Sequence, residues 1–347
     1  MRITNPMVVR NYTRHIHSNR ALLDKFSRQI ATGRRFNSFS EDNAGGIRSM
    51  NARRALNRVD TNIDNARAAQ AHLRSAEGSL MQIVEISHTI SERFVSALND
   101  TNGEIDRGIM ARELERFQEA MLGLANAQFS GRYVFGGTNT IAPPFTVCGD
   151  TGSLMYNGVL VNELSRDSND QRIVNLLRDA AHIDIGMNVT FNNDANDPTR
   201  VDPQSAFSYT LRGIDFLGIG HDNLFDTTSK MIAWLRGETQ FVDSAGNSVN
   251  VDAYDNEFGG QLLDQFRDAF THLSTTIATL GADTQFLEFT IDRLLDEQLN
   301  LRTRQQELEM REPEEAILDF KMQEFIYHAT LQMGQRLLQP TLFDFIR

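Results

Sequence analysis

Apolar residues recur at helical spacing near the amino terminus. The series consists of Val9, Tyr12, Ile16, Asn19, Leu23, Phe26 and Ile30. Steps of three and four place its members on one side of an α-helix. Asn19 is the polar exception, and a polar residue within an apolar seam can fix the register of helix packing. Gly33 then interrupts the pattern, so we predict a helix that ends just before it.

A second and much longer apolar series follows. It comprises Leu56, Val59, Ile63, Ala66, Gln70, Leu73, Glu77, Leu80 and Val84 and continues towards Phe94. The segment Asn99–Gly103 breaks this helix. A third series then runs through Met110, Leu114, Phe117, Met121 and Leu124. We therefore predict a third helix, from about Ile105 to Phe129, that returns antiparallel to the second across a short turn.

The carboxy-terminal part of the chain repeats the pattern. Steps of four and three connect Leu287, Ile291, Leu294, Gln298, Leu301, Gln305 and Leu308, within a predicted helix over about 257–311. Pro313 ends or kinks this helix, because proline cannot continue its hydrogen bonds. A last helix, over about 314–339, presents Leu318, Met322, Phe325, Ala329 and Met333. Seams of this length are typical of helices that pack in coiled coils.

The middle of the chain, about 138–255, changes from helical spacing to short alternating runs and turn residues. The predicted elements are hairpins over 145–156 and 241–251, a strand over 183–189, a helix over 224–236 and an exposed loop over 192–203. Turn residues between short β-branched and aromatic runs are typical of hairpins. The whole pattern predicts a mainly α fold with an inserted β-rich domain, in which both termini contribute long coiled-coil helices to a rod.

Composition excludes several classes of protein. Of the 347 residues, 40% are hydrophobic and 23% are charged, which is the balance of a soluble globular chain. No apolar run approaches the ~18 residues of a membrane span. Arginines and histidines near the start leave no apolar core for a secretory signal peptide. We therefore expect no membrane partner, and an export route other than a cleaved signal peptide if the protein leaves the cell.

Basic residues are concentrated in the amino-terminal part of an acidic chain. Residues 1–74 hold fourteen Lys or Arg and five Asp or Glu, whereas the whole chain has a formal charge of -12. A basic segment of this kind can bind nucleic acid, but these basic residues lie within strong heptads, and no motif that reads a DNA groove accompanies them. Only Lys25, Lys230 and Lys321 are lysines, and arginine suits interfaces better than lysine does. The basic residues could also form a solvated helix face, but we interpret the arginine-rich composition as favouring attraction between copies of the chain, and expect no nucleic-acid partner.

Histidine, glycine and acidic motifs do not assemble a predicted catalytic, cofactor-binding or metal site. No His-Glu-x-x-His pair exists, and His15 and His17 would face different sides of a helix. Gly218-Ile219-Gly220 begins like a dinucleotide loop but lacks the third glycine. The segment Asp194–Asp197 starts like a calcium loop without its later glycine and glutamate. We predict no cofactor, no metal ion and no enzyme activity.

The single cysteine, Cys148, excludes an intramolecular disulfide and a cysteine-cluster zinc site. It lies beside Gly149 in a predicted hairpin with no local histidine partner, so we interpret it as a small, partly buried residue rather than a nucleophile. A binding module or enzyme that uses the central domain, for example on carbohydrate, stays an alternative with little support.

The segment after the first helix resembles the amino-terminal signature of the bacterial flagellin family. That signature has a Ser-Gly-x-Arg-Ile core followed by an Asp-Asp-x-Ala-Gly turn. Here Thr32-Gly33-Arg34-Arg35-Phe36 stands for the core and Glu41-Asp42-Asn43-Ala44-Gly45 for the turn. Further matches follow in the family's order, at Asn99–Asn102, Asp106-Arg107 and Gln128–Gly131.

Other segments are similar to the hook-associated branch of this family, whose members join hook to filament. Gly131–Thr140, followed by Pro144-Phe145, resembles the branch's Gly-x-Tyr-Leu-Phe-x-Gly-x-x-Thr and Pro-Phe pattern. The opening Met1-Arg2-Ile3 and the ending Leu338–Phe345 are similar to its termini. The resemblance is weakest in the middle of the chain.

The resemblance implies a structural flagellar protein without catalysis. The implied domains are an amino-terminal inner helix over 1–45, coiled-coil segments over 46–137 and 256–311, a variable outer β-rich domain over 138–255, and a carboxy-terminal inner helix over 312–347. The inner helices would line a tube, with the coiled coil outside them. The implied function is an adapter between hook-associated subunits and the flagellin filament, and filament flagellin itself is the alternative.

Partners and location are also implied by the resemblance alone. The implied partners are copies of the same chain in a ring, another hook-associated protein, flagellin and a flagellar export chaperone. The implied location is the extracellular flagellum, reached through the flagellar type III export apparatus without a cleaved signal peptide.

We expect apolar stripes on the first and last helices to pack against other subunits, because a solvated tail would be polar. The predicted interface residues are Val9, Tyr12, Ile16, Leu23, Phe26, Ile30, Leu318, Met322, Phe325, Leu331, Leu338, Phe343 and Phe345. A turn between the two layers is predicted at Gly33, Asp42, Gly45 and Gly46. Glycine there would permit backbone angles that other residues resist.

Overall fold

The computed structural model describes residues 5–99, 103–149, 152–164, 170–178, 180–187, 189–190, 201 and 205–337. The chain divides into two compact units. The first consists of Met1–Asp60 and Leu295–Arg347, and the second of Thr61–Leu294. Two long helices, α2 (Asn43–Ala97) and α7 (Asn256–Glu309), contribute residues to both units. The domain boundaries expected from the resemblance stay predictions.

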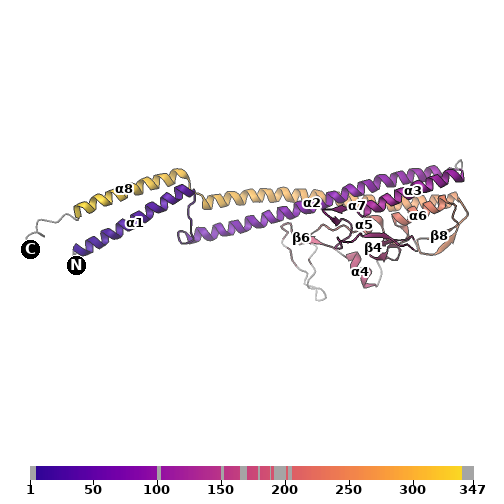
Figure 1. Cartoon of the computed structure of the whole chain (residues 1–347), viewed down its shortest axis with the longest axis horizontal. Helices are drawn as coiled ribbons and strands as arrows, with labels where there is room; N and C mark the ends of the chain where they lie inside the picture. Colours follow the sequence, from indigo (N-terminus) through magenta and orange to yellow (C-terminus); the bar gives the residue numbers. More distant parts are fainter. Residues whose placement is uncertain are drawn as a thin grey trace, which may run out of the picture. The chain divides into compact units, whose positions relative to one another are not determined.

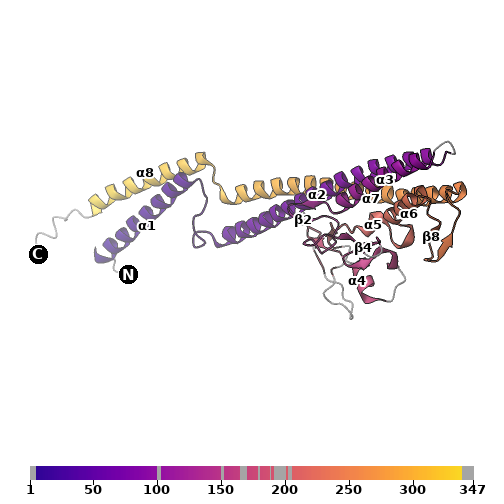
Figure 2. The same ribbon diagram turned by 45° about the vertical axis from the view of Figure 1, so that its right-hand side comes forward.

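The first unit contains the outermost helices of the chain. α1 (Asn5–Thr32) and α8 (Pro313–Leu337) lie side by side in Figures 1 and 2, where α1 is indigo and α8 is yellow. They run antiparallel, because Gln29 near the end of α1 bonds to Arg311 just before α8, whereas Tyr12 near the start of α1 touches Gly334. The predicted end of the first helix before Gly33 and the predicted break at Pro313 are confirmed.

The second unit is built on α2 and α7, which run antiparallel within it. Arg74 of α2 lies 3.9 Å from Glu288 of α7. Further along α2, the ring of His88 lies 4.7 Å from that of Phe270, nearer the start of α7. The very long second helix and the helix over about 257–311 are therefore confirmed, and their apolar seams meet as a coiled-coil pattern predicts.

A third helix, α3 (Glu104–Ala125), returns along α2, as predicted. Arg93 of α2 pairs with Glu113 of α3 at 3.1 Å. The predicted end near Phe129 is wrong, because the helix ends four residues earlier. The side chain of Asn126 both donates to the carbonyl oxygen of Phe145 and accepts from its N–H group, each at 2.9 Å. These bonds hold the chain in a non-helical path after Ala125.

The buried seam of α2 is wider than the predicted one. Gln70 and Glu77, which were predicted to lie in the seam, are half-buried, whereas Ala69 and Ala76 beside them are fully buried. His72, between these two alanines, packs its ring against those of Phe129 and Tyr209, so segments beyond α3 also cover this part of α2. The buried α2 side chains in this unit include Ile63, Ala66, Leu73, Leu80, Ile83, Ile90, Phe94 and Ala97.

The described middle of the chain contains small antiparallel sheets with short helices between them. The strands are β1 (Gln128–Phe129), β2 (Arg132–Tyr133), β3 (Phe145–Val147), β4 (Leu154–Tyr156), β5 (Val159–Leu160), β6 (His182–Ile183), β7 (Phe207–Ser208), β8 (Gln240–Val242) and β9 (Ser248–Asn250). The helices are η1 (Val161–Glu163), α4 (Gln171–Arg178), α5 (Ile214–Leu217), η2 (Gly220–Asp222) and α6 (Leu224–Leu235). Pairing of β3 with β4 and of β8 with β9 confirms both predicted hairpins, and α6 confirms the predicted short helix.

The strand predicted over 183–189 is wrong beyond its first residue. β6 ends at Ile183, and the chain then bends. Gly186 has a φ of +90°, and its N–H group donates to the side chain of Asp184 at 2.8 Å. The carbonyl oxygen of Asp184 accepts from the side-chain amide of Asn65 on α2, at 2.9 Å. Side-chain bonds therefore replace a strand ladder here, and the loop predicted over 192–203 lies outside the described residues except for Val201.

Aromatic rings form the core beneath these small sheets. The Phe135 and Phe216 rings lie 4.8 Å apart, and the Phe145 and Tyr156 rings lie 5.1 Å apart. A Cβ atom at Gly213 would lie 2.1 Å from the Phe145 ring, so the chain needs glycine at this close approach. Edge-to-face and tilted ring pairs at these distances stabilise the core beyond their buried area.

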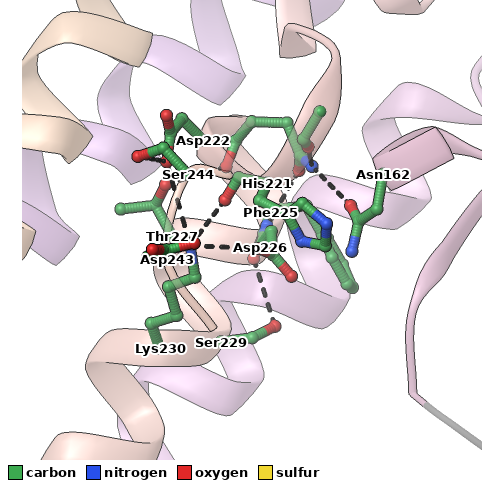
Figure 3. A network of polar contacts seen from close by, with 12 residues as sticks. Asn162, His221, Asp222, Phe225, Asp226, Thr227, Ser229, Lys230, Asp243 and Ser244 are labelled. Atoms are coloured by element: carbon green, nitrogen blue, oxygen red, sulfur yellow. Dashed lines mark hydrogen bonds and ion pairs between the residues drawn. The ribbon is translucent and has the colours of Figure 1, made fainter. Parts of the chain in front are cut away.

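A buried lysine joins α6 to its surroundings (Figure 3). Only 9% of the Lys230 side chain is exposed. Its ammonium donates to the carbonyl oxygen of His221 at 2.6 Å and lies 3.3 Å from Asp226 and 3.9 Å from Asp222. Asp222 also accepts from Ser244, in the turn between β8 and β9, at 2.9 Å. One cation therefore connects α6, η2 and the β8–β9 hairpin.

Candidate assembly interface

α1 and α8 meet through small and polar side chains. The buried Gln323 of α8 donates from Nε2 to the carbonyl oxygen of Asn19 at 3.2 Å. The Asn19 side-chain amide donates to Thr330 Oγ1 at 3.0 Å. A Cβ atom at Gly334 would lie 1.7 Å from the Tyr12 hydroxyl oxygen, so the two helices come close where α8 has no side chain. Asn19, the polar exception in the predicted stripe, thus holds the helix pair in register.

The opposite face of α8 is apolar and exposed. Leu318 is 69% exposed and Phe325 is 74% exposed, and Met322 and Met333 are exposed as well. Steps of three and four, through Ala329, place these residues on one side of the helix. We call the set Leu318, Met322, Phe325, Ala329 and Met333 the α8 stripe. It has no cover within the described part of its own unit.

The remaining predicted interface residues fall in three groups. Tyr12, Ile16, Leu23 and Phe26 are half-buried on the side of α1 that faces α8 of the same chain. Val9, Ile30 and Leu331 are exposed but lie off the α8 stripe. Leu338, Phe343 and Phe345 lie outside the described residues. The assignment of all of these residues to contacts between subunits stays a prediction.

Two connections, residues 33–42 and 310–312, pass each other where the helix pair ends. The Arg35 N–H donates to the Glu309 carbonyl at 2.7 Å, and the Arg311 N–H donates to the Gly33 carbonyl at 3.1 Å. Gly33 has a φ of +66°, a left-handed conformation that glycine adopts at no steric cost. The two connections are therefore tied through their backbones at the residue where the first helix was predicted to stop.

Asp42 caps the start of α2, and two glycines follow it. Asp42 Oδ1 accepts from the Gly45 N–H at 2.8 Å, which satisfies a donor that the helix leaves free. The expectation that Gly45 and Gly46 supply unusual backbone angles is wrong, because neither has a positive φ. Space is limited at both positions: a Cβ atom would lie 2.3 Å from the Asp42 carboxylate at Gly45 and 2.5 Å from the Phe39 ring at Gly46, so these side chains would have to move.

Glu309, at the end of α7, fastens this end of the helix to the start of α2. Arg53 donates from Nε and from Nη2 to its two carboxylate oxygens, both at 2.6 Å, and Ser49 also donates to it. The bonds from Arg53, and then those from Ser49 and Gln305, lower the pKa of Glu309 from 4.5 to about 2. We call Ser49, Arg53 and Glu309 the clasp. Sequence reasoning missed it, because the partners are far apart in the chain and no local pattern connects them.

The free energy of unfolding depends on pH through the Glu309 carboxyl of the clasp. The pKa of Glu309 is lower in the folded chain than in the unfolded chain, so the stabilisation is complete above about pH 4.5 and is lost as the pH falls towards 2. Because Arg53 is 49% exposed and solvent screens the pair, we expect a contribution of about 1–2 kcal/mol at pH 7. Urea unfolding of wild type and Glu309→Gln should differ by that amount at pH 7 and converge by pH 2. A difference that stays constant over this range would contradict the prediction.

The glycine, cysteine and acidic motifs noted in the sequence do not form a catalytic or ligand-binding site within the described residues. Gly218, with a φ of +88°, ends α5, and the three-residue η2 that follows is too short to present a phosphate-binding helix start. Cys148 is half-buried, and its N–H donates to the Ser153 carbonyl across the β3–β4 turn. Asp194–Asp197 lies outside the described residues. Within the described residues, no three His, Cys, Asp or Glu side chains gather as a metal site, and no helix is long and apolar enough to cross a membrane.

Comparison with known proteins finds similarity to flagellar proteins over part of the chain. Residues 3–140 match the family model for the bacterial flagellin N-terminal helical region. Flagellar hook-associated protein 3 of Salmonella typhimurium is 27% identical over 146 residues, which cover 42% of this chain and 46% of that protein. The Escherichia coli protein of the same name is 27% identical over 147 residues, with the same coverage. The chain thus spans about half the length of the curated relatives it matches.

Solved structures share the fold over a larger part of the chain. FlgL from Xanthomonas campestris aligns with a TM-score of 0.52 at 16% identity, over 72% of this chain and 98% of that one. The flagellar hook-associated protein-3 from Legionella pneumophila aligns with a TM-score of 0.50 at 18% identity, over 74% and 98%. Residues 3–140 are therefore similar to the amino-terminal helical region of bacterial flagellins, and the chain shares its fold with solved flagellar hook-associated proteins.

Proposed function

We propose that this chain is a structural adapter of the bacterial flagellum, which joins hook-associated subunits to the flagellin filament. The exposed α8 stripe is the observation that carries the proposal. Burying a large apolar side chain stabilises a contact by about 1.5–3 kcal/mol, and here several such side chains lie outside the core of their own chain. Bundling of terminal helices between subunits would bury them. The names of the relatives, flagellar hook-associated proteins, support a place at the hook.

The proposed partners are further copies of this chain in a ring, another hook-associated protein, flagellin and a flagellar export chaperone. The proposed location is the extracellular flagellum, reached by type III export without a cleaved signal peptide. These assignments rest on the family resemblance. A role without catalysis belongs to the same proposal and rests on the same resemblance.

Electron microscopy of a strain that lacks this chain tests the proposal. We expect intact hooks without filaments, and flagellin released into the medium, because the filament would have no seat on the hook. Supplying the full-length chain from a plasmid should restore filaments. If the strain instead releases no flagellin, the chain is the filament protein itself. Normal filaments in the deletion strain would contradict both assignments.

A further inference from the structure

Aromatic rings fasten the middle of the chain to the two long helices of the second unit. The ring of His72 on α2 lies 6.2 Å from that of Phe129 in β1 and 5.6 Å from that of Tyr209, just after β7. The ring of Phe207 in β7 stacks on that of Phe286 on α7 at 6.0 Å. We call these five residues the clamp. Its rings bring two segments that are far apart in the chain against α2 and α7.

Within the clamp, His72 is the side chain that can gain a positive charge near neutral pH. It is half-buried, and the rings of Phe129 and Tyr209 both meet it edge-on. The residues one turn away from it on α2 are uncharged, namely Ala68, Ala69, Ser75 and Ala76. At this separation, its own helix therefore places no carboxylate beside the ring to stabilise a cation.

The strands packed around His72 bring basic groups rather than acids. Tyr209 contributes a phenol, and the two residues of β1 are uncharged. The strands that pair with β1 and β7 carry Arg132 in β2 and His182 in β6. A positive charge on His72 therefore gains no favourable partner from these described strands.

α7 contributes two carboxylates close to Phe286 in the sequence. Glu288 lies 3.9 Å from Arg74 of α2 and so already has a basic neighbour. Asp283, one turn before Phe286, has its pKa raised above 3.8 by burial. Because the folded chain favours the neutral form of this acid, a fall in pH stabilises the fold at Asp283. Loosening of the clamp in acid must therefore come from a different group.

Acid acts on His72 in the opposite direction. Burial of the ring lowers the pKa of His72 from 6.5, so the folded chain favours the neutral imidazole. When the segments around the ring open locally, water reaches the ring and it takes a proton more readily. The free energy of this local opening is therefore at its full value above about pH 6.5 and decreases as the pH falls below it.

We propose that the clamp is an acid-sensitive latch, in which protonation of His72 releases β1 and the segment 205–210 from α2 while α2 and α7 stay packed. The helix contact persists because its buried side chains, such as Leu73, Leu80 and Leu287, are apolar and do not titrate. The pH thus sets how often the middle of the chain separates from the long helices. This property is independent of the place of the chain in a flagellum.

Hydrogen exchange of the purified full-length chain, followed by mass spectrometry, tests the latch. Between about pH 7.5 and pH 5.5, the amides of 127–134 and 205–210 should lose protection by about threefold or more, since one pKa unit corresponds to a factor of ten. The direct effect of pH on exchange is corrected first. The amides of 287–294 on α7 should keep their protection. This comparison within the wild-type chain needs no variant.

Two substitutions of His72 identify the group that takes the proton. His72→Phe keeps a ring but cannot be protonated, so protection of 127–134 and 205–210 should be equal at both pH values. His72→Gln loses the ring contacts, so its protection should be lower than that of wild type at the higher pH and should fall no further at the lower pH. His88→Phe is the matched control, because His88 is exposed on the same helix beside the Phe270 ring. It should keep the wild-type response.

Three results would overturn the latch. The first is unchanged protection of 127–134 and 205–210 in the wild-type chain at the lower pH. The second is an equal loss of protection in 287–294, which would mean that acid loosens the whole unit. The third is a loss that persists in His72→Phe, which would place the proton on another group.

Discussion

Replacement of Phe325 by alanine is expected to abolish filament attachment while leaving the melting temperature of the purified chain close to that of wild type. The ring is 74% exposed, so its loss leaves little cavity within its own chain. If the ring is buried in the assembled flagellum, its removal costs about 3–5 kcal/mol at every contact between subunits. In the proposed ring the same cost would repeat at every contact, so we expect a large effect on assembly. Filaments per hook, counted by electron microscopy, give the measurement.

Phe266 provides the matched control, because its ring is fully buried in the second unit. Phe266→Ala should lower the stability of the purified chain by about 3–5 kcal/mol. Comparing the two variants therefore distinguishes a side chain that acts in contacts between subunits from one that acts within the chain. A fall in melting temperature for Phe325→Ala similar to that for Phe266→Ala, with filaments still attached, would show that α8 buries this face in its own chain.

Replacement of Lys230 by methionine is expected to destabilise the second unit by about 3 kcal/mol. The change keeps most of the side-chain volume but removes the cation beside Asp226 and Asp222. The carbonyl oxygen of His221 also loses its donor. Urea unfolding, followed by the fluorescence of Trp234 on the same helix, measures the loss.

Lys321 is the matched control for this substitution. Its ammonium pairs with Glu324 at 3.0 Å, but 67% of the lysine side chain is exposed. Lys321→Met should therefore change stability by no more than about 0.5 kcal/mol. Equal effects of the two substitutions would mean that burial of Lys230 contributes nothing and that its three oxygen neighbours are satisfied by water.

Helices could be predicted from the sequence where the apolar spacing is long and regular. The predicted breaks at Gly33 and Pro313 hold because glycine and proline act on the backbone locally. The predicted seam of α2 missed Ala69 and Ala76, because this part of the helix is also covered by segments far along the chain, which pack at His72. Strands of two residues, such as β6, have too short a pattern to be recognised.

The candidate interface could be predicted only in part, because local spacing reveals apolar positions but not distant partners. The sequence suggested that Phe325 and Leu318 are exposed, since the last helix is apolar and no neighbouring segment offers to cover it. The clasp between Arg53 and Glu309 could not be found, because each residue alone is an ordinary charge on a helix. The role of Gly45 was misjudged because a backbone requirement and a space requirement select the same residue, and only coordinates distinguish them.

The contact between α1 and α8 only half-buries its large apolar side chains, such as Tyr12, Ile16, Leu23 and Phe26. No large apolar side chain in the described part of either helix is fully buried, and the contact depends on hydrogen bonds of Asn19 that water can replace. The free energy needed to pull this end of the molecule apart is therefore low, and local opening should be frequent. If the chain is exported and assembled as proposed, this low cost would let α1 and α8 separate during export and pack again against neighbouring subunits.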